Sequence, residues 1–231
     1  MFLMGATRCG ISAKQIQREV VVTYKTAWRM AHQLRKLMAE DVQLEGSSVE
    51  VDEMYYGGRR KGGTGRPMRG DKVKTPVLGM VERHGRVIAK AVKDTTAKTL
   101  CGIVREYVLP DSIVFTDELN AYNTVSKDRR YTHRRIKHSA GVYVMGDVHT
   151  NTIEGFWSLV KRGIGGVYHS VSQKHLQSYL NEYSFRYNRR ESPAPMFTLL
   201  LNQVSLKAGQ ELKAPPEAID QSPVESNQEP F

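Results

Sequence analysis

Three acidic residues occupy positions from which they could form a metal-dependent site for phosphoryl transfer. Asp52 lies where apolar and polar residues alternate, Asp117 ends a short apolar stretch, and Glu154 lies at the start of a predicted helix. Three carboxylates at one site repel one another unless a cation neutralises them, and hard oxygen ligands suit Mg²⁺ or Mn²⁺. Two such ions about 3.5–4 Å apart would clamp the attacking and leaving oxygens of a phosphodiester. Each acid alone fits an ordinary surface carboxylate, and only their joint placement indicates a metal site.

The predicted helix that carries Glu154 holds two further candidates. Lys161 lies seven residues after Glu154, so the two side chains lie two turns apart on one helix face. Glu154 could bind a metal ion there while the Lys161 ammonium meets a DNA phosphate. The alternative is a spaced ion pair on a solvated helix. Asn151, one turn before Glu154, could cap the helix or reach the same site.

The excess of basic residues favours a polyanionic partner. The 231 residues include 34 Lys and Arg against 24 Asp and Glu, a formal net charge of +10. Nucleic acid is the commonest partner of so basic a chain, although a basic protein can also be merely soluble. The candidate DNA-binding residues are Lys25, Arg29, Lys36, Arg59, Arg60, Lys61, Arg134, Arg135 and Arg162. Solvated surface charge is the alternative for these residues.

Residues 1–42 have the outline of a helix-turn-helix. They hold seven Lys or Arg against three acids. Ser12 can cap a helix that runs to about Val20, and a second helical pattern with an apolar stripe runs from Lys25 to about Met38. The order helix, short turn, basic helix is typical of a DNA reader. An ordinary helical hairpin with a solvated basic face has the same pattern.

From residue 48 onward, the hydrophobic period predicts a mixed sheet flanked by helices. Strands are predicted at residues 48–54, 76–83, 86–92, 112–116 and 131–138. Helices are predicted at residues 96–107, 118–125, 152–162, 173–187 and 195–204. This order predicts an α/β protein with a mixed α+β sheet, in which residues 48–205 form an RNase H-like catalytic domain. The first and fourth strands are neighbours in that fold, so Asp52 and Asp117 can point to the same spot, and a helix beside the sheet can bring in Glu154.

Composition limits the other classes of protein. Only Cys9 and Cys101 are present, which excludes a disulfide scaffold and a Cys-rich zinc site and suits the reducing cytoplasm. No run approaches 18 apolar residues, so neither a membrane-spanning helix nor a membrane partner is expected. Pro, Glu, Gln and Ser dominate the end of the chain, and residues 206–231 are predicted to form a disordered tail.

Three stretches of the sequence resemble a known family. They are Val49–Gly58, His149–Arg162 and Tyr183–Arg190. They are similar to DDE-class transposases of bacterial insertion sequences related to the Merlin transposons, which have an ISXO2-like integrase or transposase domain. The resemblance extends over about residues 2–204 and includes the helix-turn-helix. It implies a transposase that cleaves the ends of an insertion sequence and transfers the cut strand into double-stranded DNA, with two Mg²⁺ or Mn²⁺ ions.

The resemblance also assigns residues to the site. Asp52, Asp117 and Glu154 match the metal-binding acids of that family, and Lys161 matches the basic residue that follows them. Some branches of the family have Asn in the third place, which Asn151 could fill. Glu154 ranks first, because a carboxylate binds Mg²⁺ better than an amide does.

One departure from the family concerns the beginning of the chain. Full-length relatives usually begin with a zinc ribbon, for which this sequence has no Cys pair. A truncation, a late start codon and a degenerate copy are the alternatives. A homo-oligomer is expected, because two element ends must be joined. Two other functions fit the same residues: an inactive or domesticated remnant that acts as a DNA-binding regulator, and an RNase H-fold DNA nuclease.

Overall fold

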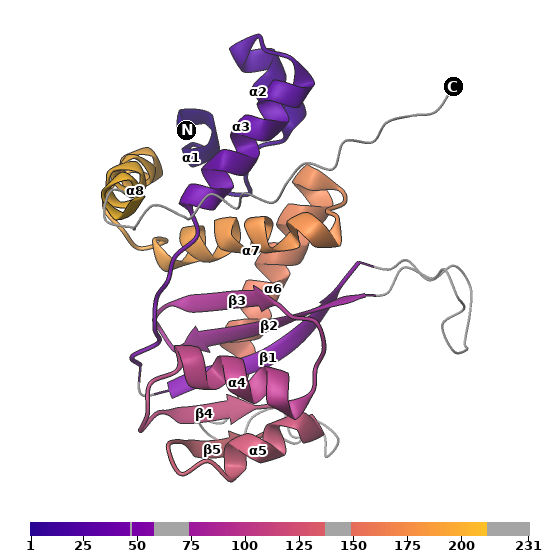
Figure 1. Ribbon diagram of the computed structural model, residues 1–231, viewed down its shortest axis with the longest axis vertical. Helices are drawn as coiled ribbons and strands as arrows, with labels where there is room; N and C mark the ends of the chain where they lie inside the picture. The colour runs from indigo at the N-terminus through magenta and orange to yellow at the C-terminus, as the bar shows by residue number, and fades with distance from the viewer. Residues whose placement is uncertain (47, 58–73, 137–148, 212–231) are drawn as a thin grey trace, which may run out of the picture.

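A computed structural model describes residues 1–46, 48–57, 74–136 and 149–211 (Figure 1). Within these residues, five strands form one sheet in the order β3-β2-β1-β4-β5. The strands are β1 (Ser48–Tyr56), β2 (Thr75–Glu82), β3 (Val87–Ala91), β4 (Ile113–Thr116) and β5 (Thr132–Arg135). β1, β2 and β3 form an antiparallel meander, and β4 and β5 add in parallel on the other side of β1. This mixed sheet confirms the predicted RNase H-like order.

Apart from the short first helix, which the sequence does not predict, the helices follow in the predicted order. They are α1 (Phe2–Gly5), α2 (Ala13–Val20), α3 (Tyr24–Leu37), α4 (Ala97–Tyr107), α5 (Asn123–Ser126), α6 (Asn151–Gly163), α7 (Gln173–Asn188) and α8 (Met196–Glu211), with a 3-10 turn at Asn120–Tyr122 and a π-helical turn at Ile164–Tyr168. None of the helices in the described part of the chain is long and apolar enough to cross a bilayer.

The last helix is longer than the sequence predicts. α8 passes residue 204 and ends at Glu211, so the segment 206–211 of the predicted disordered tail is helical. Proline is the residue that most strongly stops a helix, and after Pro195 the next proline is Pro215. Residues 212–231, which hold the rest of the predicted tail, lie outside the described residues.

Alternation along β1 assigns its side chains to the two faces of the sheet. Successive side chains of a strand point to opposite faces. Val49 and Val51 pack with residues of α4, whereas Met54 packs with residues of α6 and α7. α4 therefore covers one face, and α6 with α7 covers the other (Figure 1). Because β1 is covered on both faces, its polar side chains Glu50 and Asp52 need partners inside the protein.

Glu50 anchors the N-terminus of α6 to β1. Its buried carboxylate accepts hydrogen bonds from the backbone N–H groups of Thr152 and Ile153, at 2.9 and 3.1 Å. Arg83 donates Nε to Glu50 at 2.9 Å and Nη2 to the His149 carbonyl at 2.9 Å. The first N–H groups of a helix lack partners within the helix and carry partial positive charge. The carboxylate therefore fixes where α6 begins, and with it the place of every α6 residue relative to β1.

Two amide side chains of α7 cover the outer edge of β3. Gln177 accepts the N–H of Ala91 at 2.8 Å and donates to the carbonyl of Ala89 at 3.0 Å. Asn188 accepts the N–H of Val87 at 2.7 Å and donates to its carbonyl at 3.2 Å. These contacts replace the pairing that a further strand would supply at a sheet edge. They also fix α7 along the sheet.

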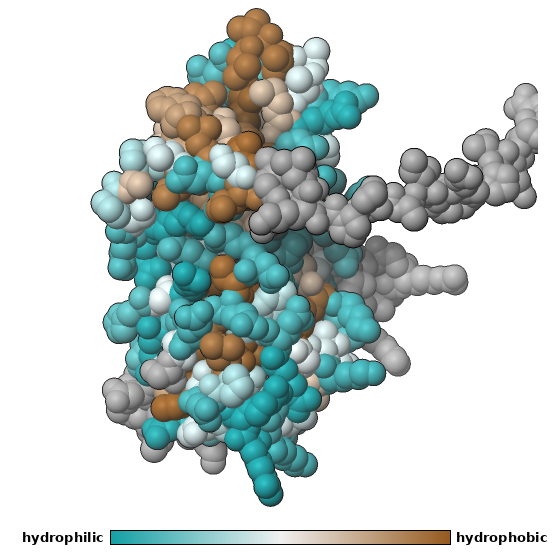
Figure 2. All heavy atoms as spheres, turned by 60° about the vertical axis from the view of Figure 1, so that its left-hand side comes forward, coloured by the Kyte–Doolittle hydropathy of each residue, from teal (hydrophilic) through white to brown (hydrophobic). Residues whose placement is uncertain are grey.

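The two N-terminal helices and their turn lie at the predicted places. Ser12 and Thr23 cap α2 and α3 with side-chain oxygens that accept backbone N–H groups in the first turn. Between the helices, Val21 adopts a left-handed conformation with φ 55°. This end of the molecule exposes apolar side chains, which Figure 2 shows as brown surface. They include Phe2, Val20, Val21, Tyr24 and Met30.

Glu182 of α7 ties these N-terminal helices to the rest of the protein. Its fully buried carboxylate accepts hydrogen bonds from Arg35 Nε at 2.8 Å, Arg186 Nη2 at 2.9 Å and the Tyr168 hydroxyl at 3.0 Å. Arg186 also donates to the Met4 carbonyl at 2.6 Å. A buried charge is costly unless it is paired and hydrogen-bonded. This cluster therefore holds α3 and α1 against α7.

Replacing Glu50 by Gln should destabilise the protein by about 3 kcal/mol, because the change leaves the Arg83 charge without its buried partner. The measurement is the free energy of unfolding from a urea titration followed by circular dichroism. Glu45→Gln removes the same charge from an exposed side chain and should cost less than about 0.5 kcal/mol. Equal stabilities of the two variants would contradict the anchoring role of Glu50.

Acid should destabilise the protein through His32. This α3 imidazole is buried beside Trp28 and His175, with ring centroids at 4.0 and 4.7 Å. Burial first, and the nearby Arg35 charge next, lower the pKa of His32 from 6.5 to about 4. Between these two pH values the unfolded chain binds a proton at His32 and the folded chain does not. The free energy of unfolding therefore falls as the pH drops from 6.5 to about 4.

Urea unfolding at about pH 7 and at about pH 5 measures the larger part of this loss. Wild type should lose more stability between the two conditions than His32→Gln, which cannot take up the proton. An equal loss in both proteins would show that the folded state protonates His32 as readily as the unfolded state does.

Candidate active site on β1 at the end of β4

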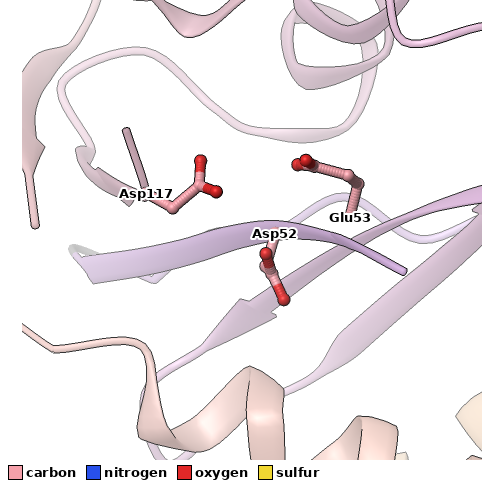
Figure 3. A group of neighbouring side chains, drawn as sticks. All are labelled: Asp52, Glu53 and Asp117. Atoms are coloured by element: carbon pink, nitrogen blue, oxygen red, sulfur yellow. The ribbon is translucent and has the colours of Figure 1, made fainter. Parts of the chain in front are cut away.

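The parallel pairing of β1 with β4 brings Asp52 and Asp117 together. Val51 pairs with Thr116 at the end of the ladder, and Asp52 and Asp117 are the next residues along the chain. The two carboxylates and that of the neighbouring Glu53 each offer an oxygen, and these oxygens all lie within 4.8 Å of one another (Figure 3). We call these three residues the acid cluster.

Glu53 is absent from the residues that the sequence predicts for this site. Adjacent residues of a strand face opposite sides of a sheet. A site on the face that carries Asp52 is therefore not expected to include Glu53. The length of the strands is the signal that could have found it. β1 has nine residues and β4 has four, so β1 continues past the end of its partner. Side chains from both faces of β1 can turn toward the space beyond that end.

Asp52 is held from the face of the sheet that α6 covers. Trp157 of α6 donates its indole N–H to Asp52 Oδ2 at 3.0 Å. Burial raises the pKa of Asp52 to about 6; the Trp157 hydrogen bond opposes the shift, and the charges of Asp117 and Glu154 add to it. A cation beside Asp52 would offset the cost of keeping this carboxylate charged.

Glu53 is held from the opposite face. The hydroxyl of the fully buried Tyr122 donates to Glu53 Oε2 at 2.9 Å. Burial raises the pKa of Glu53 to about 7, and the charge of Asp117 adds to the shift, while the Tyr122 hydrogen bond opposes it. The carboxylates of Glu53 and Asp117 point toward each other, whereas that of Asp52 lies on the other side of β1 (Figure 3).

Local contacts hold Asp117 beyond the end of β4. Its Oδ1 accepts the N–H of Leu119 at 3.0 Å, a turn contact typical of Asp. Arg135 of β5 donates to the carbonyls of Asp117 and Glu118 and to Asn123 Oδ1 at 2.6 Å. The guanidinium of Arg135, a predicted DNA-binding residue, is therefore engaged by the loop that carries Asp117.

The acid cluster fits a divalent cation. Carboxylate oxygens are the ligands that Mg²⁺ and Mn²⁺ prefer. Within the residues that the structure describes, no Lys, Arg or His forms an ion pair with any of the three acids. Burial first, and the charges of the neighbouring acids next, raise the pKa of Asp52 and of Glu53, and a cation between the carboxylates would offset both effects.

Glu154 lies near the acid cluster without joining it. The residue is exposed in the first turn of α6, and its Oε1 accepts a hydrogen bond from the Thr150 hydroxyl at 3.2 Å. It is not among the acids whose oxygens lie within 4.8 Å of one another. Its charge nevertheless contributes to the raised pKa of Asp52, so the two side chains are close enough to interact.

The other predicted residues of α6 are exposed. Asn151 is the first residue of the helix and does not cap it, because Thr150 is the N-cap residue and Glu50 receives the free N–H groups. Lys161 and Arg162 lie in the last turn and are also exposed.

Most of the predicted DNA-binding residues that the structure describes lie at the surface. Lys25, Arg29 and Lys36 of α3 and Arg134 of β5 are exposed. The α3 residues lie on the opposite side of the helix from Ala27, Ala31 and Met38, which are buried. Residues 59–61, the predicted basic run of Arg59, Arg60 and Lys61, lie outside the described residues.

Comparison with known proteins places the chain among transposases. Residues 43–188 match the family model described as the ISXO2-like transposase domain. An uncharacterized protein in the transposable element ISH50 of Halobacterium salinarum is 34% identical over 197 residues, which are 78% of this chain and 65% of that protein. An uncharacterized transposase-like protein of Haemophilus influenzae is 32% identical over 106 residues, 46% of this chain and 84% of that protein.

The family match and the site coincide in the chain. The present chain spans 65% of the length of the Halobacterium relative. The matched residues include the whole sheet, the helices α4 to α7 and all three members of the acid cluster. Because the match covers more than half of the chain, this protein belongs to the family of ISXO2-like transposase domains.

Proposed function

We propose that this chain is an insertion-sequence transposase that uses divalent ions to cleave DNA at the ends of an element and to transfer the cut strand into target DNA. One observation carries the proposal. The register of β1 with β4 places the carboxylates of Asp52 and Asp117 together, and it does so within a transposase domain.

The chain contributes position and charge to this reaction. Asp52 and Asp117 would hold the metal from neighbouring strands, and Glu154 would approach from α6. Mg²⁺ or Mn²⁺, with two ions expected, would neutralise charge on the attacking and leaving oxygens of the phosphodiester. The strands fix the two aspartates by their register, and Glu50 fixes the start of α6. Such preorganisation supplies most of the catalysis in phosphoryl transfer.

The α2–α3 pair offers a separate surface for double-stranded DNA. In a helix-turn-helix, residues near the N-terminus of the second helix enter the major groove. Lys25 and Arg29 are exposed in that part of α3, and Lys36 extends the basic surface along the helix. The buried ion pair of Arg35 with Glu182 fixes α3 on α7, so this surface keeps its place relative to the acid cluster.

Further phosphate contacts would come from the last turn of α6. Lys161 and Arg162 are exposed there, and basic side chains that contact phosphates set the register and orientation of a protein on DNA. An insertion sequence has two ends, and both must be cut and joined. We therefore include a homo-oligomer in the proposal, with one acid cluster for each end.

Asp52→Asn and Asp117→Asn should each abolish metal-dependent DNA cleavage and leave DNA binding intact or tighter. Each change removes a charged oxygen from the acid cluster and leaves the exposed basic residues of α3 in place. The assay follows supercoiled plasmid and labelled element ends with Mg²⁺, Mn²⁺ or EDTA. Asp41→Asn, at an exposed position, is the matched control. Full cleavage by either variant would remove that residue from the site.

The products of the same assay separate the possible functions. Metal-dependent joining of ends would establish a working transposase. Nicking without joining would instead indicate an RNase H-fold nuclease. Binding without any cleavage would indicate a DNA-binding regulator.

The double variant Lys25→Gln, Arg29→Gln should bind double-stranded DNA more weakly and with less dependence on salt. Each lost phosphate contact lowers the slope of log K against log salt by about 0.9, so the double variant should lose up to about 1.8. The double variant Lys93→Gln, Lys98→Gln, at two exposed positions, removes the same number of charges elsewhere and controls for net charge. A slope equal to that of wild type would exclude these two side chains from the phosphate contacts.

A further inference from the structure

We infer that Glu53 is a further metal ligand, which together with Asp52 and Asp117 holds one divalent cation independently of Glu154. The inference rests on the metal-dependent function proposed above and specifies which side chains form its tighter ion site. It assigns a role to an acid that stands next to the predicted aspartate of β1 and belongs to the other face of the sheet.

Asp52 and Glu53 lie on opposite faces of β1. Asp52 faces α6, where it meets Trp157 at 3.0 Å. Glu53 faces the other way, where it meets Tyr122 at 2.9 Å. Neighbouring side chains of a regular strand point away from each other. Two adjacent carboxylates of such a strand are therefore not expected to bind the same ion. An oxygen of each nevertheless lies within 4.8 Å of the other and of Asp117.

The end of β4 explains how the two faces meet. The β1–β4 ladder runs from the pair of Ser48 with Ile113 to the pair of Val51 with Thr116. Beyond it, Asp117 takes the place where the next residue of β4 would pair. Glu53 and Asp117 point toward each other on one side of β1, whereas the Asp52 carboxylate lies on the other side (Figure 3). One oxygen from each of the three carboxylates still lies within 4.8 Å of the other two, so an ion beside β1 at this point would have ligands from both faces.

The partners of Glu53 support binding at its remaining oxygen. Tyr122 is fully buried among the residues beneath α4, and its hydroxyl engages Oε2 of Glu53. A hydrogen bond from a buried residue to a ligating carboxylate orients that ligand. Tyr122 is therefore a positioning residue, which directs the other oxygen of Glu53 toward Asp117.

Glu154 differs from Glu53 in each of these respects. It is exposed, it contacts the nearby Thr150 hydroxyl, and its oxygens lie outside the 4.8 Å group. It belongs to α6, which covers the face of β1 that carries Asp52. Glu154 is therefore placed to serve a second ion on that face, and the first ion does not require it.

The test is a calorimetric titration of Mn²⁺ into the full chain without DNA. Loss of a partner that only orients a ligand weakens metal affinity by about 10–100-fold, so loss of the ligand itself in Glu53→Gln should weaken the tighter site by at least about tenfold. Tyr122→Phe should weaken the same site by about tenfold. Glu154→Gln and the exposed control Glu106→Gln should both keep wild-type affinity at that site.

Thermal unfolding checks that the variants fold. Gln keeps an oxygen for the Tyr122 hydroxyl, so the metal-free melting temperature of Glu53→Gln should match that of Glu106→Gln. Added Mn²⁺ should raise the melting temperature of wild type more than that of Glu53→Gln, because a ligand stabilises the folded state in proportion to its affinity. This difference reports ligation even if the metal-free variant is somewhat less stable.

The outcomes distinguish the inference from the function on which it rests. Wild-type affinity in Glu53→Gln, with binding lost in Asp52→Asn and Asp117→Asn, would overturn the role of Glu53 and leave the proposed function standing. Loss of the tighter site in Glu154→Gln would overturn its independence from Glu154. Absence of Mn²⁺ binding to wild type at millimolar concentration would count against both the inference and the metal-dependent function.

Discussion

The register between β1 and β4 is the constraint on which the candidate site depends. The two strands are parallel and run side by side, and Val51 pairs with Thr116. The next residues along the chain, Asp52 and Asp117, therefore lie beside each other. A shift of one residue would turn every β1 side chain to the other face of the sheet. It would move the buried valines of β1 away from α4 and separate Asp52 from Trp157. The hydrophobic packing of both faces therefore protects the geometry of the acids.

Two buried carboxylates attach the helices to this sheet. Glu50 holds the start of α6, and Glu182 holds α3 and α1 against α7. Both are fully buried, and each is paired with arginine. Buried pairs contribute little net stability compared with apolar packing, but breaking one is costly. Their effect here is to give α6 and α3 one position each, which suits a reaction that depends on fixed geometry.

The fold places the acid cluster and the exposed basic residues of α3 on different parts of the molecule. The acid cluster lies at the end of β4, where the register of β1 with β4 fixes its position. The exposed basic residues of α3 lie on a different layer, and the predicted arginine Arg135 belongs to neither surface, because it holds the loop after Asp117. Loss of cleavage and loss of binding should therefore come from different substitutions, and a variant that loses both points to the buried contacts between the layers.

The sequence by itself determined the local features of this protein. Period-two and helical spacing gave the order of strands and helices, and Ser12 gave the start of α2. The side-chain types of Asp52, within one predicted strand, and of Asp117, at the end of another, indicated metal chemistry. These features depend on residues close to one another in the chain. The spacing of the apolar residues among them indicates which face of a helix or strand is buried.

Which charged side chains are buried was determined only by the tertiary structure. Arg35 belongs to the same basic segment as Lys36, yet it is buried against Glu182, 147 residues away in the chain. Glu50 and Glu53 flank Asp52 as ordinary acids of an alternating strand, but one caps a helix 102 residues away and the other joins the acid cluster. A buried charge is tolerated only where a partner meets it. Because that partner belongs to a distant segment of the chain, the local sequence pattern does not predict which charged residue is buried.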